Sequence, residues 1–122
     1  MLNDAYSDVI RRRLEVPLSE GPDKATTLEE AVRRLVKPGM TLHLGTAHAR
    51  ANVHVRELVR QWWGKQPAFT IATVGLGSPW TALIHGGLVK RMITTFLGEG
   101  YPFPVPSPLI SKAVLEGRLE VQ

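Results

Sequence analysis

The chain has 122 residues, of which 43% are hydrophobic and 21% charged, and its net charge is +4. Such a composition is typical of a folded domain or part of one and excludes a disordered tail, while every apolar run is shorter than the roughly 20 residues of a membrane-spanning helix. The absence of cysteine excludes disulfides, thiolate nucleophiles and cysteine-bound zinc, and with no signal-peptide pattern after Met1 we expect a cytoplasmic protein with no membrane contact.

The first predicted elements follow an N-terminal extension, residues 1–24, to which we assign no chemistry. Two overlapping capping-box patterns over residues 26–30 open a helix, and apolar residues recur after them at helical spacing. A Lys-Pro-Gly run ends this helix, and a strand over residues 40–44 is expected to end on Gly45. We expect residues 25–122 to form the N-terminal part of one α/β domain.

The same order of helix and strand repeats along the rest of the chain. The expected strands are 69–74, 89–97 and 119–122, and the helices that precede them are 52–63, 79–85 and 109–115. Alternating helices and strands with short connections predict right-handed crossovers, and therefore an α/β fold with an open parallel sheet and flanking helices on both faces. Because the chain stops within its last strand, we expect the sheet to be incomplete in this chain.

Glycine follows three of the predicted strands. In open parallel sheets, ligands bind outside the carboxyl ends of the strands, where glycine lets backbone approach the ligand and helix N-termini favour anionic groups. The positive net charge suits an anionic ligand such as a phosphate-bearing cofactor. The expected ligand-binding residues therefore come from the three strand-end loops: Gly45, Thr46, Ala47, His48, Arg50, Gly75, Gly77, Ser78, Gly98 and Glu99.

Other kinds of site are less well supported by these loops. The second loop begins like a dinucleotide fingerprint, but Trp80 stands where the third glycine belongs, so we expect no nicotinamide cofactor; Ser78 and Pro79 instead resemble the start of a helix. The four histidines lack ligand spacing, so no metal is expected. Two interpretations stay open for His48, which is either a group that meets the ligand or an ordinary surface residue.

Glu99 is the only carboxylate in the predicted crevice. A lone carboxylate that acts as nucleophile or base needs a second group or an oxyanion site within reach, and the sequence shows no Ser-His-Asp arrangement. We therefore expect Glu99 to be auxiliary, orienting a partner loop or positioning substrate, and no catalytic residue in this chain. No nucleic-acid-binding signature accompanies the positive charge, so nucleic acid is not an expected partner.

Four segments carry a resemblance to a known family: residues 27–45, 52–60, 87–99 and 113–121. In the same order, they are similar to the N-terminal portion of the A-type (alpha) subunit of family I coenzyme A transferases, particularly the glutaconate CoA-transferase branch. The similarity covers roughly residues 25–122. No single motif is diagnostic, and the specificity lies in their order and spacing together.

This resemblance implies a hetero-oligomeric enzyme that acts on acyl-CoA thioesters, with coenzyme A bound as part of the substrate and no metal. In transferases of this family the catalytic glutamate lies on the B-type half, so the resemblance implies a B-type partner and an inactive isolated chain. A-type subunits are also longer than this chain. A further chain that continues the A-type subunit is therefore expected, this chain being a fragment or a natural split subunit.

The resemblance also implies a role for the loop after the first strand, which forms the wall facing the catalytic half. The family often has Gly-Gly-Phe there, and the matching residues are Gly45, Thr46 and Ala47. This difference changes both backbone freedom and the shape of the acyl pocket. Relatives of the same architecture hydrolyse, ring-open or decarboxylate acyl-CoA compounds, so these reactions remain alternatives to CoA transfer, and a non-catalytic assembly subunit is a third possibility.

Overall fold

A computed structural model describes residue 22 and residues 25–45, 51–77, 80–98 and 105–122. Its helices are α2 (Leu28–Leu35), α3 (Asn52–Trp62), α4 (Thr81–His85) and α5 (Pro108–Leu115). Its strands are β1 (Thr41–His43), β2 (Phe69–Ala72), β3 (Gly75–Leu76), β4 (Val89–Ile93), β5 (Phe96–Leu97) and β6 (Glu120–Val121). Within these ranges, no helix is long and apolar enough to cross a membrane.

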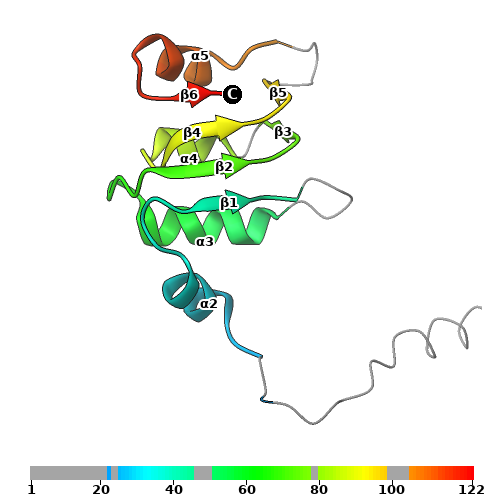
Figure 1. Ribbon diagram of the computed structural model, residues 1–122, viewed down its shortest axis with the longest axis vertical. Coiled ribbons are helices and arrows are strands. Elements are labelled where there is room, and N and C mark those ends of the chain that lie inside the picture. Colours follow the sequence, from blue (N-terminus) through cyan, green and yellow to red (C-terminus); the bar gives the residue numbers. More distant parts are fainter. Residues whose placement is uncertain (1–21, 23–24, 46–50, 78–79, 99–104) are drawn as a thin grey trace, which may run out of the picture.

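Four parallel strands form the main sheet in the order β1-β2-β4-β6, and β3 pairs with β5 in a second, two-stranded sheet (Figure 1). Successive right-handed crossovers in one direction put their helices on one face, and α3, α4 and α5 lie behind the sheet in Figure 1. The α/β class with an open parallel sheet is thereby confirmed. Helices were expected on both faces, whereas those of the described residues cover one.

Helix α2 forms where the sequence places a helix start. The N-cap residue Thr27 accepts a hydrogen bond from the backbone N–H of Glu30 at 3.2 Å, which satisfies one of the free amides of the first turn. Arg33 and Arg34 lie in the last turn, where positive charge stabilises the helix dipole. Of the two overlapping capping patterns, the one that begins at Thr27 is therefore the one used.

The hydrophobic core lies between the sheet and the row of helices. Along β2, Phe69 and Ile71 are fully buried, while the alternate residues Thr70 and Ala72 are only half-buried on the other face. The largest fully buried side chains are Phe69, Ile71, Leu76, Leu83, Leu88 and Met92. One face of the sheet thus carries the core, and the other carries smaller and more polar side chains.

Two of the expected strands are interrupted near their carboxyl ends. The strand expected over 69–74 divides into β2 and β3, and the one expected over 89–97 divides into β4 and β5. The hydroxyls of Thr94 and Thr95 both donate to the carbonyl of Val74, at 3.2 and 2.6 Å. Because these side chains bond to backbone at the junction, the ladder breaks and resumes as the β3–β5 pair.

The start of α4 also differs from the expectation. The helix begins at Thr81 with Trp80 as its N-cap residue, two residues after the predicted start, and Ser78 and Pro79 lie outside the described residues. The backbone N–H of Trp80 donates to the carbonyl of Gly77 at 2.9 Å, and the Trp80 side chain is buried. Burial of this large side chain, which a short-range capping pattern does not register, accounts for the later start.

Candidate functional site

Three of the glycines predicted to bind a ligand lie just beyond the carboxyl ends of strands, and the fourth, Gly75, lies at the amino end of β3. Gly45 follows β1 by two residues, Gly75 and Gly77 begin and follow β3, and Gly98 follows β5. The other predicted site residues lie outside the described residues: Thr46, Ala47, His48, Arg50, Ser78 and Glu99. The structure therefore describes the backbone frame of the candidate site and not most of its side chains.

Hydrogen bonds hold the three strand ends level with one another. The N–H of Leu44 donates to the carbonyl of Ala72 at 2.9 Å, and the N–H of Thr73 donates to the carbonyl of Ile93 at 3.0 Å. The segments that follow β1, β2 and β4 therefore begin side by side, at the carboxyl ends of the strands. This is the edge where open α/β sheets bind ligands.

The glycines near these strand ends differ in how much room a side chain would have. A Cβ on Gly98 would overlap the carbonyl oxygen of Val105, so the close approach of the chain to itself requires glycine there. A Cβ on Gly75 would make ordinary contacts of 3.7 Å with Phe96. A Cβ on Gly45 would meet no described atom within 4 Å, so packing among the described residues does not explain glycine at this position.

A side-chain hydrogen bond joins the helices that follow the first two loops. The indole Nε1–H of Trp80, at the start of α4, donates to Oδ1 of Asn52, the first residue of α3, at 2.7 Å. The bond fixes the two helix starts relative to each other beside the loops. Local sequence patterns do not reveal this pair, because 28 residues separate its members. The one signal in the sequence is a tryptophan in place of the third glycine.

The electrostatics of the described edge favour an anion over a cation. The N-cap residue of α3, Ala51, makes no side-chain capping bond, and no acidic residue lies in the first turn of this helix. Neither the N-cap nor the first turn of α3 therefore supplies a side-chain carboxylate to its free amides, which suits a negatively charged ligand. In the described ranges, no three His, Cys, Asp or Glu residues lie close enough to hold a metal ion.

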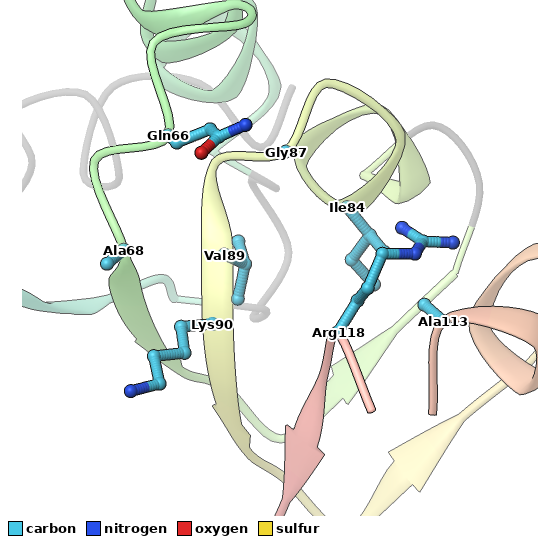
Figure 2. A pocket seen from close by; sticks show the side chains of 8 residues that line it. All are labelled: Gln66, Ala68, Ile84, Gly87, Val89, Lys90, Ala113 and Arg118. Carbon is cyan, nitrogen blue, oxygen red and sulfur yellow. The ribbon is translucent and has the colours of Figure 1, made fainter. Parts of the chain in front are cut away.

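A cavity of about 340 Å³ lies at the opposite, amino-terminal ends of β2 and β4 (Figure 2). Gln66 and Ala68, which line it, have positive φ angles of 50° and 56°. Lys90 and Arg118 also line it, but Figure 2 shows their charged groups pointing apart, and Arg118 pairs with Glu116 at 2.6 Å. The cavity therefore offers no convergent charge and takes no part in the candidate site.

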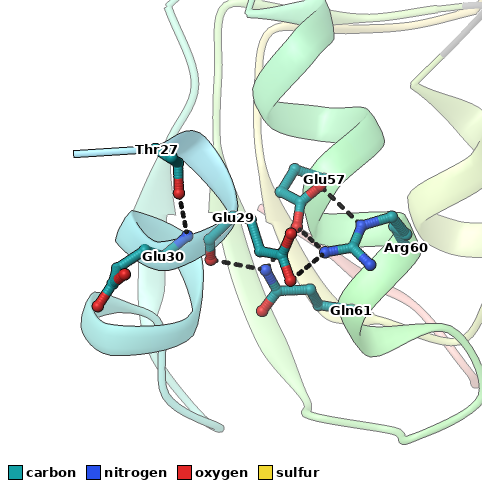
Figure 3. A network of polar contacts seen from close by, with 6 residues as sticks. All are labelled: Thr27, Glu29, Glu30, Glu57, Arg60 and Gln61. Atoms are coloured by element: carbon teal, nitrogen blue, oxygen red, sulfur yellow. Dashed lines mark hydrogen bonds and ion pairs between the residues drawn. The ribbon is translucent and has the colours of Figure 1, made fainter.

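A polar network on the outer side of α3 fixes α2 against it (Figure 3). Arg60 contacts Glu57 at 2.7 Å and Glu29 at 3.2 Å, and Gln61 donates to the carbonyl of Glu29 at 2.9 Å. The hydrogen bond from Arg60 is the main reason that the pKa of Glu57 falls to about 2, and the same pairing raises the pKa of Arg60. These shifts belong to a structural contact and do not indicate a catalytic acid or base.

Comparison with known proteins identifies both a family and a fold. A family model described as Coenzyme A transferase matches residues 25–122. Among solved structures, the chain is similar to a chain of the decarboxylase AibA/AibB, determined as a cysteine-to-serine variant, with a TM-score of 0.63 and 23% sequence identity. This match covers 80% of the present chain but 37% of that chain, so the present chain spans little more than a third of its neighbour's length. No curated protein matches the sequence.

Proposed function

Because the chain belongs to the coenzyme A transferase family, we propose that it is one part of a hetero-oligomeric cytoplasmic enzyme that transfers coenzyme A between acyl-CoA thioesters and carboxylates. A B-type partner chain carries the catalytic glutamate in this proposal, and coenzyme A enters as part of the substrate without a metal. The observation that carries the proposal is that the carboxyl ends of β1, β2 and β4 lie level, with glycines at residues 45, 75 and 98 beyond them, inside the segment that the family model matches.

The proposed acyl-CoA wall consists of the three strand-end loops. Gly45 carries most of the argument, because no described atom lies within 4 Å of the space that its missing Cβ would fill. An acyl-CoA thioester that approaches the backbone at Gly45 would make use of that space. Thr46 and Ala47 are proposed to shape the acyl pocket, and the remaining contacts are assigned to His48, Arg50, Gly75, Gly77, Ser78, Gly98 and Glu99, with Glu99 auxiliary to the partner's chemistry.

A second candidate function is cleavage of acyl-CoA without an acceptor, by hydrolysis, ring opening or decarboxylation. The observation that favours it is that the structural neighbour is named as a decarboxylase. The replacement of the family's Gly-Gly-Phe by Gly45-Thr46-Ala47 supports a changed reaction or substrate as well. A non-catalytic assembly subunit is the third candidate, and it predicts that substitutions in these loops leave turnover unchanged.

Turnover by the purified complex tests the proposal. The tagged chain is isolated with the polypeptides that copurify with it, and acyl-CoA consumption is measured with and without an added carboxylate. A transferase consumes acyl-CoA only when the acceptor is present, whereas a decarboxylase or hydrolase forms product without it. A complex that neither binds nor consumes any acyl-CoA in a panel of short and branched acyl chains would contradict the proposal.

The variant Gly45→Ala tests where the substrate binds. We expect a severalfold higher KM for acyl-CoA with an unchanged unfolding midpoint, because the added methyl meets no described atom of the chain itself. The variant Gly98→Ala is the contrast: its Cβ overlaps the Val105 carbonyl, so we expect a lower unfolding midpoint as well as weaker binding. An unchanged KM in Gly45→Ala would show that the substrate does not bind at the loop after β1.

A further inference from the structure

Three exposed apolar side chains lie at the small sheet formed by β3 and β5. They are Val74, which directly precedes β3, Phe96 in β5, and Val105, and they are 66%, 45% and 47% exposed. Figure 1 shows β3 and β5 beyond the arrowheads of β2 and β4, so these side chains belong to the carboxyl-terminal edge of the main strands. Exposed apolar side chains gathered at one place are characteristic of ligand-binding surfaces.

The pairing of β3 with β5 directs Phe96 away from the core. Leu76 pairs with Leu97; Leu76 is fully buried, and Leu97 packs against the core. Because successive residues of a strand point to opposite faces, Gly75 and its partner Phe96 face the other side. The Phe96 ring is therefore free to contact a ligand without any change in the core.

Two glycines of the candidate site leave room for this ring. The Cβ and Cδ1 atoms of Phe96 lie 3.7 Å from the position of a Cβ on Gly75, and its Cζ atom lies 3.4 Å from the corresponding position on Gly98. The ring thus spans from one glycine to the other. It joins the second and third strand-end segments of the candidate site through an apolar surface.

Backbone hydrogen bonds fix the position of Phe96. The N–H of Thr95 donates to the carbonyl of Val74 at 3.3 Å, and the N–H of Gly98 donates to the carbonyl of Leu76 at 3.1 Å. These bonds lie on both sides of Phe96 along β5 and tie it to β3. The ring is therefore held in place before a ligand arrives, which lowers the entropic cost of binding.

We propose that Phe96 binds the hydrocarbon chain of the acyl group in acyl-CoA, and that it gives the enzyme a preference for apolar acyl groups. The side chains of Val74, Phe96 and Val105 contain only carbon and hydrogen. They gain free energy when they bury an alkyl chain, and they offer no partner to a second carboxylate on the acyl group. The inference rests on the proposed function, because it names the part of the acyl-CoA substrate that meets β5.

Binding of three acyl-CoA compounds to the purified complex tests the proposal. Acetyl-CoA, valeryl-CoA and glutaryl-CoA are compared by calorimetry, since glutaryl-CoA carries a carboxylate in place of the terminal methyl of valeryl-CoA. We expect valeryl-CoA to bind about tenfold more tightly than either of the others, because it alone buries an uncharged chain on Phe96. Equal affinities, or tighter binding of glutaryl-CoA, would overturn the proposal.

Substitutions of Phe96 show whether its ring causes the preference. Phe96→Ala should abolish the preference for valeryl-CoA over acetyl-CoA, and Phe96→Leu, which keeps an apolar side chain, should retain part of it. Trp63→Leu is the matched control, because Trp63 is 50% exposed but lies at the C-terminal end of α3, away from the strand-end segments. If Phe96→Ala keeps the full preference, the ring only shields the backbone of the two glycines and the proposal is wrong.

Fluorine NMR gives a second readout, made on the unsubstituted complex. Fluorophenylalanine is incorporated into this chain, and the resonance of Phe96 is assigned from its loss in Phe96→Leu. Valeryl-CoA should shift this resonance more than acetyl-CoA does, whereas the resonance of the fully buried Phe69 should not move. A Phe96 resonance that stays in place at saturating valeryl-CoA would contradict direct contact.

These outcomes distinguish failure of this inference from failure of the proposed function. A complex that binds all three acyl-CoA compounds with equal affinity retains the proposed function and refutes the role of Phe96. A complex that binds none of them refutes both, because the inference depends on an acyl-CoA substrate.

Discussion

At the scale of single residues, two tryptophans of the core differ in how their indole N–H groups are satisfied. Trp80 donates to Asn52 at 2.7 Å, whereas the buried Nε1 of Trp62 has no hydrogen-bond partner among the described residues. Trp62 packs edge-on against Phe69 instead, with a centroid separation of 5.5 Å. Trp80 is buried and Trp62 is half-buried, and the two side chains also differ in polar contacts.

Replacing each tryptophan by phenylalanine should reveal this difference. We expect Trp80→Phe to lower the free energy of unfolding by about 1 to 3 kcal/mol more than Trp62→Phe, because it leaves Asn52 without its donor. Urea denaturation of the two variants measures the difference. Equal losses would show that the Trp80–Asn52 bond does not hold the starts of α3 and α4 together.

The charge on Glu57 gives a pH dependence with a definite sign. Its pKa in the folded chain falls from 4.5 to about 2 because Arg60 donates hydrogen bonds to it. A lowered folded-state pKa means that the stabilisation is fully present above about pH 4.5 and is lost as the pH falls toward 2. Contact between α2 and α3 should weaken over the same range, since Arg60 also pairs with Glu29.

Glu57→Gln tests this assignment. The urea midpoint of the wild-type chain should fall between pH 4.5 and 2, and the variant should show a shallower fall over this range. Part of the slope should remain, because Arg91 also lowers the pKa of Glu120 through a hydrogen bond. The assignment to Glu57 is wrong if the variant keeps the full wild-type slope.

At the scale of the elements, α2 shows how far a local pattern determines where a helix begins. Its start was predicted from two overlapping patterns of Thr and Glu, and the structure selects Thr27 over Thr26. The Glu30 side chain pairs with Arg33 at 3.3 Å. A local pattern thus predicted that a helix begins here, and the residue that caps it emerged from the structure.

Thr27→Ala and Thr26→Ala form a matched pair for this cap. Thr27→Ala should lower the free energy of unfolding by about 1 kcal/mol, because the Glu30 amide loses its acceptor. Thr26→Ala should change it by less than about 0.5 kcal/mol, as is usual for an exposed side chain away from such contacts. Chemical denaturation checks both values, and a larger loss in Thr26→Ala would place the helix start one residue earlier.

Other elements show where local patterns stop being informative. Residues 89–97 predict one continuous strand because most of them favour β-structure, yet strand β4 ends at Ile93 and β5 begins at Phe96. The break depends on bonds from Thr94 and Thr95 to Val74, a residue 20 positions away from Thr94. No local propensity reports a partner at that separation, so the division into β4 and β5 could not be predicted.

At the scale of the whole molecule, the described helices cover one face of the main sheet. Its edge strands, β1 and β6, have no further strand beside them among the described residues. Strand order β1-β2-β4-β6 follows the order of the chain, so each crossover helix falls on the same side. The core therefore lies on one side of the sheet, and Ile93 on β4 stays 40% exposed on the other.

The candidate site was predictable as far as its backbone. Gly45 and Gly98 were placed after strands from the sequence, and the structure has them there, whereas Gly75 begins β3 instead of ending a strand. The reasons for these glycines were not predictable: Gly98 is required by contact with Val105, whereas no described residue comes within 4 Å of the position of a Cβ on Gly45. The binding roles of all the predicted site residues, including those outside the described ranges, stay predictions.

The sequence by itself determined the class of fold and the position of most elements, because helix caps, glycines and the change from helical to alternating spacing act over a few residues. Tertiary structure alone decided which face of the sheet is covered, where two strands break, and that α2 overhangs the edge of β1. These features depend on the handedness of crossovers and on contacts between distant residues such as Asn52 and Trp80. The glycines that follow the strands were therefore visible in the sequence, while the close contact that requires glycine at Gly98 became visible only when the chain was folded.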